Sequence, residues 1–466
     1  MKFYSHVIRM AGRARIAVTG IQDQWLTGEP QFSYFVTVYK RHTRFSTEAV
    51  EMPFTGDVSF GSSVDCRVPN NIGDLMRGVT LKVKLGNLSS DVFGTSINGL
   101  TSGTFVSDTV QNYYNISLGK SIIKYADLII GGQVIERLTG EYIYMYDQLH
   151  SNKDDVDQTL YFMNGHNKSS SVSPDGFGYN TFYINLPFYF YRNPGLAVPV
   201  CALTKQLVEV RVTFRDVDDD VTFKYTTDSS GIVKREKTTE GSIINASLIT
   251  DFYFITEDEK NFLLTRPMEY VITQLQKSSI QFKPGELKKS VMLNFENPVK
   301  ELMFLAKEDT GPNFNAEDHL LNTSASDQSF DSYLQGNTVG SATNTKRSDH
   351  RALKNIKLEC NGATVFDHSG QYLAYQQSLR YHTGCPDPAY EFYTYSFALK
   401  PEVYYPTGQL NMSRIIHKKL DIELDTIPTA TSGTTTATNT RNINVGVYAH
   451  SYNVLHIESG LAGLKF

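Results

Sequence analysis

Apolar and polar residues alternate along much of the chain, in short runs that end at Gly, Pro, Asn or Asp. A period of two is typical of a half-buried strand, whose successive side chains point to opposite faces of a sheet. Helical spacing is rare and predicts short helices at 137–150 and 369–380, with a third beginning within 27–42. The clearest predicted strands are 79–85, 122–130, 207–214, 251–256, 290–295, 301–306, 356–360 and 443–457.

Long polar segments separate these strands. They are rich in Ser, Thr, Asn, Asp and Gly, and loops longer than about 15 residues are usually functional or mobile. In 426–440 the many Thr residues favour an extended backbone, so an exposed ribbon competes with disorder there. We expect the insertions at 87–118, 151–180, 215–249, 307–350 and 425–441.

The chain nearly repeats itself at an offset of 230 residues. In both copies an apolar strand leads into a turn with Gly, then a short polar strand and an aromatic-rich segment. A long repeat with non-identical copies indicates two similar domains, and the many short strands favour two antiparallel β-sandwiches. The matching residues are Gly132, Gly140 and Tyr142 in the first copy, and Gly362, Gly370 and Tyr372 in the second.

Composition agrees with an all-β protein of two domains. At 466 residues the chain exceeds what one core usually supports, so two domains of roughly 200 residues are expected. The aromatic fraction of 12% comes almost entirely from 28 Tyr and 27 Phe, which favour strands. No apolar run reaches the roughly 18 to 20 residues that a membrane-spanning helix requires.

The net charge of −5 argues against direct binding of nucleic acid, which requires clustered Lys and Arg. The N-terminal 20 residues are an exception, because they are basic, contain no acid and lack the apolar stretch of a secretory signal. They predict either an arm that docks on an anionic lipid surface or acidic partner, or an ordinary exposed terminus. The four cysteines are widely spaced, which favours reduced thiols.

No motif predicts catalysis, a cofactor or a metal. The eleven His residues show no HxH, HxxxH or HExxH spacing, and His450 and His456 on one strand are more often packed or solvated than metal-binding. The segment 114–121 ends like a phosphate-binding loop but has Tyr114 where that loop needs Gly. The acidic run 216–220 is best explained as a solvated turn.

Three long segments carry a resemblance to a known family. They are GIQDQWLTGEPQFSYFVTVYKRHTRFSTEAVEMPF (20–54), PTGQLNMSR (406–414) and YNVLHIESGLAGLKF (452–466). Each resembles the major capsid proteins of nucleocytoplasmic large DNA viruses, of the iridovirus, phycodnavirus and marseillevirus kind. Because the segments lie at the start, within the second copy and at the end, the resemblance covers essentially the whole chain.

The resemblance implies a double jelly roll, in which two eight-stranded antiparallel β-sandwiches follow one another, with long inserted loops and a few short helices. It divides the chain into an N-terminal arm and lead-in segment at 1–44, a first jelly roll at 45–256, a linker at 257–267 and a second jelly roll at 268–466. The insertions would then crown the outward end of the sandwiches.

The same resemblance implies a structural protein of the virion capsid with no enzymatic activity and no cofactor. Three chains would form a homotrimer, and this pseudo-hexagonal capsomer would tile an icosahedral shell assembled in host cytoplasm. Its expected partners are neighbouring capsomers, minor capsid and penton proteins, and the internal viral membrane through the N-terminal arm. No direct contact with nucleic acid is expected.

The resemblance also assigns roles to residues near the N-terminus. The cations expected to contact the inner face are Arg9, Arg13 and Arg15. In the lead-in segment, apolar residues are expected to pack against the base of the first sandwich, and cations to face a neighbour. These lead-in residues are Trp25, Leu26, Phe32, Phe35 and Tyr39 for packing, and Arg41, His42 and Arg44 for contact.

A tandem β-sandwich that binds or cleaves carbohydrate is the alternative. Aromatic residues and long loops fit it, but a lectin would be expected to expose Trp at loop tips, and the single Trp25 lies in the N-terminal segment. A glycosidase needs two carboxyl groups about 5 to 9.5 Å apart, which a sequence does not place. A penton-type capsid component is disfavoured by the duplication, since such proteins are usually single jelly rolls.

Overall fold

A computed structural model describes most of the chain, as two units, Met1–Arg44 and Phe45–Phe466, each considered on its own. Every strand of the described residues belongs to the second unit. The described residues are 20–31, 33–35, 41–86, 91–92, 109–114, 122–151, 181–217, 221–227, 233–237, 241–309, 353–386, 392–424, 428–431, 434–437 and 442–466.

The first sandwich consists of two four-stranded antiparallel sheets, with the strand orders β1-β12-β3-β8 and β2-β9-β6-β7. Burial alternates along β9 residue by residue, so each sheet turns an apolar side toward the other. Its strands are β1 (Phe45–Pro53), β2 (Ser63–Val68), β3 (Leu75–Leu85), β6 (Ile123–Ile130), β7 (Gln133–Thr139), β8 (Thr181–Leu186), β9 (Val208–Phe214) and β12 (Ile243–Ile255).

The second sandwich repeats this arrangement with the orders β13-β23-β15-β18 and β14-β20-β16-β17. Two short strands, β19 (Leu410–Asn411) and β24 (Leu461–Leu464), extend its first sheet. The other strands are β13 (Met268–Phe282), β14 (Lys288–Met292), β15 (Pro298–Asp309), β16 (Leu353–Cys360), β17 (Ala363–Ser369), β18 (Tyr393–Ser396), β20 (Lys418–Leu424) and β23 (Asn442–Glu458).

The two sandwiches are copies of one fold, the jelly roll, and the predicted double jelly roll is confirmed. Each strand of the first sandwich has a counterpart at the same place in the strand order of the second. The turns between β6 and β7 and between β16 and β17 each hold two residues with positive φ, 59° and 84° at Gly131 and Gly132, and 50° and 84° at Asn361 and Gly362. Such paired left-handed residues form the tight hairpin turn that follows the twist of the strands.

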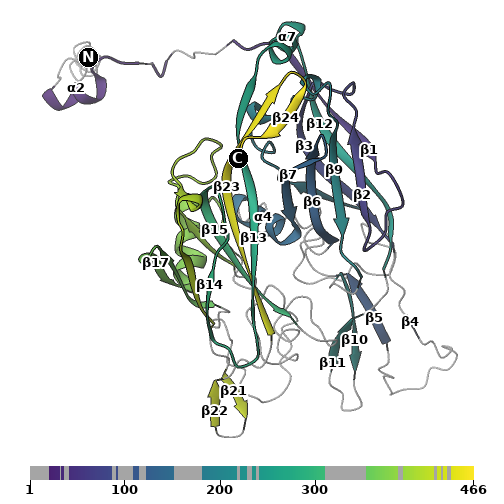
Figure 1. Cartoon of the computed structure of the whole chain (residues 1–466), viewed down its shortest axis with the longest axis vertical. Helices are drawn as coiled ribbons and strands as arrows, with labels where there is room; N and C mark the ends of the chain where they lie inside the picture. The colour runs from purple at the N-terminus through teal and green to yellow at the C-terminus, as the bar shows by residue number, and fades with distance from the viewer. Residues whose placement is uncertain are drawn as a thin grey trace, which may run out of the picture. The chain divides into compact units, whose positions relative to one another are not determined.

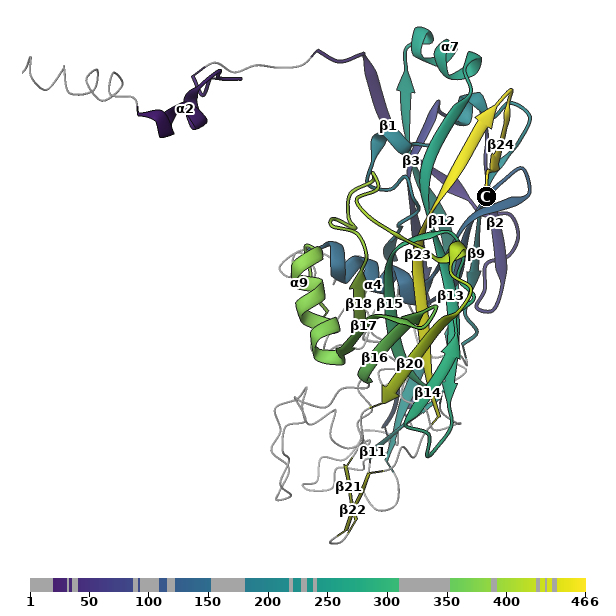
Figure 2. The same ribbon diagram turned by 60° about the vertical axis from the view of Figure 1, so that its left-hand side comes forward.

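Helices and smaller β elements connect or flank the sandwiches. Figures 1 and 2 show the small β elements at the end of the sandwiches opposite α7. No helix of the described residues is long and apolar enough to cross a membrane. These elements are α4 (Gly140–His150), η2 (Pro194–Leu196), η3 (Val200–Ala202), α7 (Glu257–Thr265), η5 (Tyr372–Gln376), α9 (Gln377–Tyr381), η6 (Met412–Arg414), the sheet β4 (Asp91–Val92), β5 (Thr109–Tyr114), β10 (Thr222–Thr227) and β11 (Val233–Lys237), and the ribbon β21 (Pro428–Thr431) and β22 (Thr434–Ala437).

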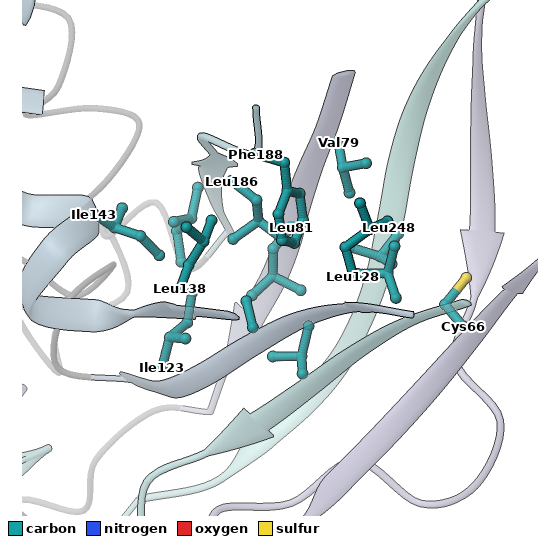
Figure 3. Close-up of a cluster of buried hydrophobic side chains, with 14 of the residues drawn as sticks. Cys66, Val79, Leu81, Ile123, Leu128, Leu138, Ile143, Leu186, Phe188 and Leu248 are labelled. Atoms are coloured by element: carbon teal, nitrogen blue, oxygen red, sulfur yellow. The ribbon is translucent and has the colours of Figure 1, made fainter. Parts of the chain in front are cut away.

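Each sandwich encloses a core, and the first core continues beyond its own sandwich. Figure 3 shows part of it, where Leu81, Leu128 and Leu248 come from three different strands. The same cluster also includes Met303 and Leu305, which belong to β15 of the second sandwich. The two sandwiches therefore share a buried apolar contact along one sheet of the second.

Three predictions from the sequence need correction. The helix expected to begin within 27–42 does not begin in the described part of that range, where α2 (Ile21–Thr27) ends and 28–31, 33–35 and 41–42 are not helical; residues 32 and 36–40 lie outside the described residues. The insertion predicted at 215–249 ends too late, because β12 starts at Ile243 and its apolar residues enter the first core. The insertion predicted at 307–350 starts too early, since β15 runs to Asp309. The Thr-rich segment forms the ribbon β21–β22 in its described part.

Candidate functional site

The helix α4 stands between the two sandwiches (Figure 1). Its first turn is fixed by the side chain of Thr139, which accepts a hydrogen bond from the backbone N–H of Tyr142 at 3.2 Å, as an N-cap residue does. One face of α4 packs on its own sandwich, where Ile143 and Leu149 join the first core. The other face meets the second sandwich, where the ring of Tyr142 lies edge-on to His450 at 5.7 Å.

Strand β15 is buried on both faces. Its residues Leu302 and Phe304 point into the core of the second sandwich, whereas Met303 and Leu305 alternate with them and belong to the first core. At the far end of α4, the backbone N–H of Gly384 donates to the carbonyl of Leu149 at 2.7 Å. A Cβ at position 384 would lie 2.1 Å from a backbone oxygen of α4, so the chain passes here only as glycine.

One group of charges lies at the start of α4. The carboxylate of Glu141 is 2.6 Å from Arg215, 3.5 Å from Lys307 and 3.7 Å from Lys277. Burial alone would raise the pKa of Glu141, but the charges of Arg215 and the two lysines hold it well below its usual value. Because Lys277 and Lys307 come from the second sandwich and Glu141 from the first, these ion pairs join the two.

A second group of charges surrounds Glu301 on β15. Its carboxylate accepts a hydrogen bond from Nδ1 of His450 at 2.9 Å and lies 3.3 Å from Nε2 of His382. On its other side the His382 ring is 3.7 Å from Glu402. Burial would raise the pKa of Glu301, but the bond from His450, followed by the charges of His382 and Lys300, lowers it. Burial would also raise the pKa of Glu402, but its interactions with His382 and Thr383 lower that pKa to about 2.

Two histidines of this group are held neutral near pH 7. Burial and the charge of Lys300 lower the pKa of His450 to about 4, although Glu301 acts in the opposite direction. Burial and the charge of Arg192 lower the pKa of His150, at the end of α4, to about 3. The His150 ring stacks on Tyr146 at 3.9 Å, so it fills space as an aromatic group.

Lys300 and Glu136 complete the buried polar set. Lys300 is the extra residue of a β-bulge in β15, and its Nζ donates to the carbonyl of Pro401 at 2.8 Å. Glu136 accepts the backbone N–H of Tyr189 at 2.8 Å. Burial raises the pKa of Glu136 to about 8, even though that hydrogen bond and the charge of Lys300 act against the rise.

This arrangement is suited to holding two sandwiches together. Its charged groups find their partners within the protein, and no group of three or more His, Cys, Asp or Glu in the described ranges is placed to bind a metal ion. His456, the other histidine considered for a metal, lies between Glu269 and Glu458 on the surface. The residues of this site therefore form a buried junction between the two sandwiches of one chain.

Two family models match consecutive parts of the chain. Residues 33–256 match the model described as the major capsid protein N-terminus, and residues 259–463 match the large eukaryotic DNA virus major capsid protein. The major capsid protein of Phaeocystis pouchetii virus is 27% identical, with 98% of this chain and 99% of the relative covered. That of Paramecium bursaria Chlorella virus 1 is 28% identical, with the same coverage.

The chain belongs to the major capsid protein family of large eukaryotic DNA viruses. It is a structural, non-enzymatic protein of the virion capsid of icosahedral viruses. A chain in the quasi-atomic model of the PBCV-1 capsid has the same fold, with a TM-score of 0.69 at 24% identity, covering 93% of this chain and 100% of that one. The carbohydrate-binding alternative thereby loses its support.

The contact and packing residues predicted from the sequence of this capsid protein all lie in the N-terminal unit, Met1–Arg44. None of them belongs to the junction between the sandwiches. Within that unit the side chains of Trp25 and Phe35 are 88% and 97% exposed, and Arg41 and Arg44 are also exposed. Their packing and contacts stay predictions. The nominated residues outside the described ranges are Arg9, Arg13, Arg15, Phe32 and Tyr39.

Sequence reasoning missed the junction residues of the capsid protein. A signal was present, because Lys300 and Glu301 directly precede the apolar run 302–306, and His450 lies within the longest predicted strand. Charged residues on a strand that is buried on both faces are expected only where oppositely charged or hydrogen-bonding groups pair with them. His382 and Glu402 gave no such signal, since both lie outside strands.

Replacing Glu301 with Gln is expected to lower the free energy of unfolding by about 3 kcal/mol or more. The substitution removes one partner of a buried ion pair and leaves His382 and Lys300 without its charge. Urea unfolding measures the effect. The matched control is Glu209→Gln, which breaks an ion pair with the largely exposed Arg67 and should cost less than about 1 kcal/mol. Equal costs at the two sites would contradict the interpretation.

The stability of the capsid protein is expected to fall as the pH drops from 6.5 toward 4. In the unfolded chain His150 and His450 titrate near pH 6.5, whereas the folded pKa values are about 3 and about 4. The unfolded state therefore binds more protons in this window. Glu136 has the opposite effect, because its pKa is about 8 in the folded protein and about 4.5 in the unfolded chain. The folded state therefore binds the extra proton between these values, and the stability that Glu136 contributes is lost as the pH rises from about 4.5 to 8.

The variant His450→Gln separates these contributions. It removes one titrating histidine, so the slope of unfolding free energy against pH between 6 and 5 should flatten by up to about 1.4 kcal/mol per pH unit. Urea unfolding at several pH values gives both slopes. An unchanged slope would rule out His450 as a source of acid sensitivity, whatever the variant's stability at pH 7.

Proposed function

We propose that three copies of this chain form a pseudo-hexagonal capsomer, and that capsomers tile the icosahedral shell. The observation that carries the proposal is the presence in one chain of two sandwiches with the same strand order. Three such chains supply six jelly rolls, so a trimer has a nearly six-fold outline. A hexagonal outline lets one subunit pack against neighbours on all sides of a lattice.

The proposed division of the chain has four parts. An arm and lead-in segment at 1–44 precedes a first jelly roll at 45–256, a linker at 257–267 and a second jelly roll at 268–466. Two features support these limits, since β1 begins at Phe45 and α7 occupies the linker. On this division α7 connects the last strand of one sandwich to the first strand of the next.

Neighbouring capsomers, minor capsid proteins and penton proteins are the proposed partners of the trimer. Assembly in host cytoplasm agrees with the cysteines, because all four are free thiols. Thiols are kept reduced in that compartment. The proposed shell contacts are weaker than the contacts within a trimer, because a lattice must assemble reversibly to correct errors.

The N-terminal arm is proposed to contact the internal viral membrane. Arg9, Arg13 and Arg15 would bind the anionic lipid surface, at about 1 kcal/mol for each cation. The lead-in residues Trp25, Phe32, Phe35 and Tyr39 would pack against the base of a sandwich, with Arg41 and Arg44 facing a neighbour. The exposure of Trp25 and Phe35 within their own unit supports this, since large apolar side chains favour burial.

The purified chain is expected to be a trimer. Light scattering after size-exclusion chromatography should give three times the mass of one chain, and electron micrographs of the same peak should show particles with a hexagonal outline. Stable trimers of this kind usually bury 2,000 Å² or more, so the trimer should persist at micromolar concentration. A strict monomer at that concentration would contradict the proposal.

Replacing Arg9, Arg13 and Arg15 together with Gln is expected to weaken binding to phosphatidylserine vesicles about 100-fold. The estimate follows from about 1 kcal/mol for each lost cation near the surface. Vesicle flotation with full-length protein measures the binding, and vesicles of neutral phosphatidylcholine give its background. The control variant Arg67→Gln removes an exposed cation from a sandwich and should leave binding unchanged. Equal binding by all three proteins would contradict the role of the arm.

A further inference from the structure

Two insertions of the first sandwich meet in one small sheet, with the strand order β11-β10-β5-β4. Strands β4 and β5 come from the insertion predicted at 87–118, and β10 and β11 come from the insertion predicted at 215–249. Val221, directly before β10, is fully buried in the first core. The sheet is therefore attached to the first sandwich, and it lies at the end opposite α7 (Figures 1 and 2).

The strand register assigns the residues of this sheet to its two faces. Residues paired directly across two strands share a face, and neighbours along one strand alternate between faces. Phe223 of β10 is paired with Tyr113 of β5 and with Lys237 of β11. Tyr225, two positions further along β10, is paired with Arg235. All five therefore lie on one face, which we call the aromatic face: Tyr113, Phe223, Tyr225, Arg235 and Lys237.

Charge is divided unequally between the two faces of the sheet. The opposite face has two cations together with both acids of the four strands, namely Lys224, Lys234, Asp91 and Glu236. The aromatic face has the cations Arg235 and Lys237 and no acid from these four strands. Its positive charge is therefore not balanced within the sheet, although the chain as a whole has a net charge of −5.

The two cations of the aromatic face favour an anionic ligand. A charge that leaves water needs an oppositely charged or hydrogen-bonding partner, and the four strands supply no acid on this face. Arg235 and Lys237 are two positions apart on the edge strand β11, which is about 7 Å along the strand. Arginine pairs with a carboxylate through two parallel hydrogen bonds, and lysine binds anions as a point charge. The pair therefore fits a ligand with repeated anionic groups.

The aromatic residues add a second kind of contact beside these cations. Phe223 and Tyr225 are two positions apart on β10, about 7 Å along the strand, and Tyr113 is on the next strand, about 5 Å away. Aromatic residues bring large, flat apolar surfaces. A sugar ring has an apolar face of C–H groups that packs on such surfaces. Aromatic and cationic residues on adjacent strands therefore fit a polymer that combines sugar rings with acidic groups.

We infer that the aromatic face binds an acidic polysaccharide, one whose sugar rings carry carboxylate or sulfate groups. Nucleic acid also combines rings with anions, but a protein that binds it contacts many phosphates, commonly about six to ten, and this face has only two cations. The inference concerns the inserted sheet and leaves the sandwiches in their structural role. If the insertions lie at the outward end of the shell, which rests on the proposed function, the ligand belongs to the surface of the host cell.

Two double variants compare the faces of the sheet. Arg235→Gln with Lys237→Gln removes both cations of the aromatic face and is expected to weaken binding to alginate, a carboxylated polysaccharide, and to dextran sulfate about tenfold or more. The matched control, Lys224→Gln with Lys234→Gln, removes the same charge from the opposite face and should change the affinity less than about twofold. Biolayer interferometry with full-length protein measures both, and neutral dextran gives the background. Equal losses in the two variants would overturn the inference.

The variant Phe223→Leu tests the aromatic contact. Leucine keeps an apolar residue at this position but has no flat ring, so binding to the polysaccharides is expected to fall about fivefold. This loss should persist in high salt, whereas the loss caused by removing the cations should shrink, because salt screens charges. Tyr225→Leu repeats the test, so that a folding defect at one position does not decide the outcome, and Tyr114→Leu on the opposite face is the control. Unchanged binding by both aromatic-face variants would overturn the inference.

Single-stranded DNA is the competing ligand in the same experiment. The unsubstituted chain is expected to bind alginate or dextran sulfate more tightly than oligothymidine of similar length, and a preference between the two polysaccharides identifies the anionic group. Tighter binding of the DNA would overturn the inference, as would the absence of binding to both polysaccharides. Light scattering of the same samples reports the oligomeric state separately. A trimer that binds neither polysaccharide refutes only this inference, whereas a monomer refutes the proposed function.

Discussion

The inner strands β23 and β15 of the sheet β13-β23-β15-β18 are buried on both faces, and the rest of the structure depends on this constraint. One face closes the core of the second sandwich, and the other continues the core of the first. A sheet in a free sandwich has one face in water, where polar residues cost nothing. Here the second face is under α4, so a polar residue on it must find a partner within the chain.

Two groups of ion pairs satisfy that requirement. Glu141 reaches cations of the second sandwich, and Glu301 is held by His450 and His382. Removing charges from water is expensive, and a buried pair adds little net stability compared with apolar residues of the same size. Its effect is on specificity, because a misplaced junction would leave each charge unpaired. The junction therefore fixes one orientation of the sandwiches, and acid weakens it as the histidines are driven to take up protons.

The two sandwiches are copies of one fold whose surfaces are not identical. Both sandwiches keep the turn with two left-handed residues and the bulge beside it, because these set the geometry of the sheet. Their outward faces differ, since Met303 and Leu305 are replaced by Thr80 and Lys82 in the equivalent strand. The same fold thus provides a permanent junction inside the chain and, at the equivalent place in the first sandwich, a half-buried surface with polar residues.

The sequence by itself determined the local structure and the duplication. Alternation of polar and apolar residues located half of the sixteen strands in the two sandwiches, and Gly132 and Gly362 revealed the repeat. A strand's period and a left-handed turn are both properties of neighbouring residues. Alternation failed for the first half of β12, whose polar residues were assigned to an insertion. Only the tertiary structure decided which sheet face is covered, and by what. Glu301, His382 and His450 meet from separate segments, and no local pattern encodes the contact that brings them together.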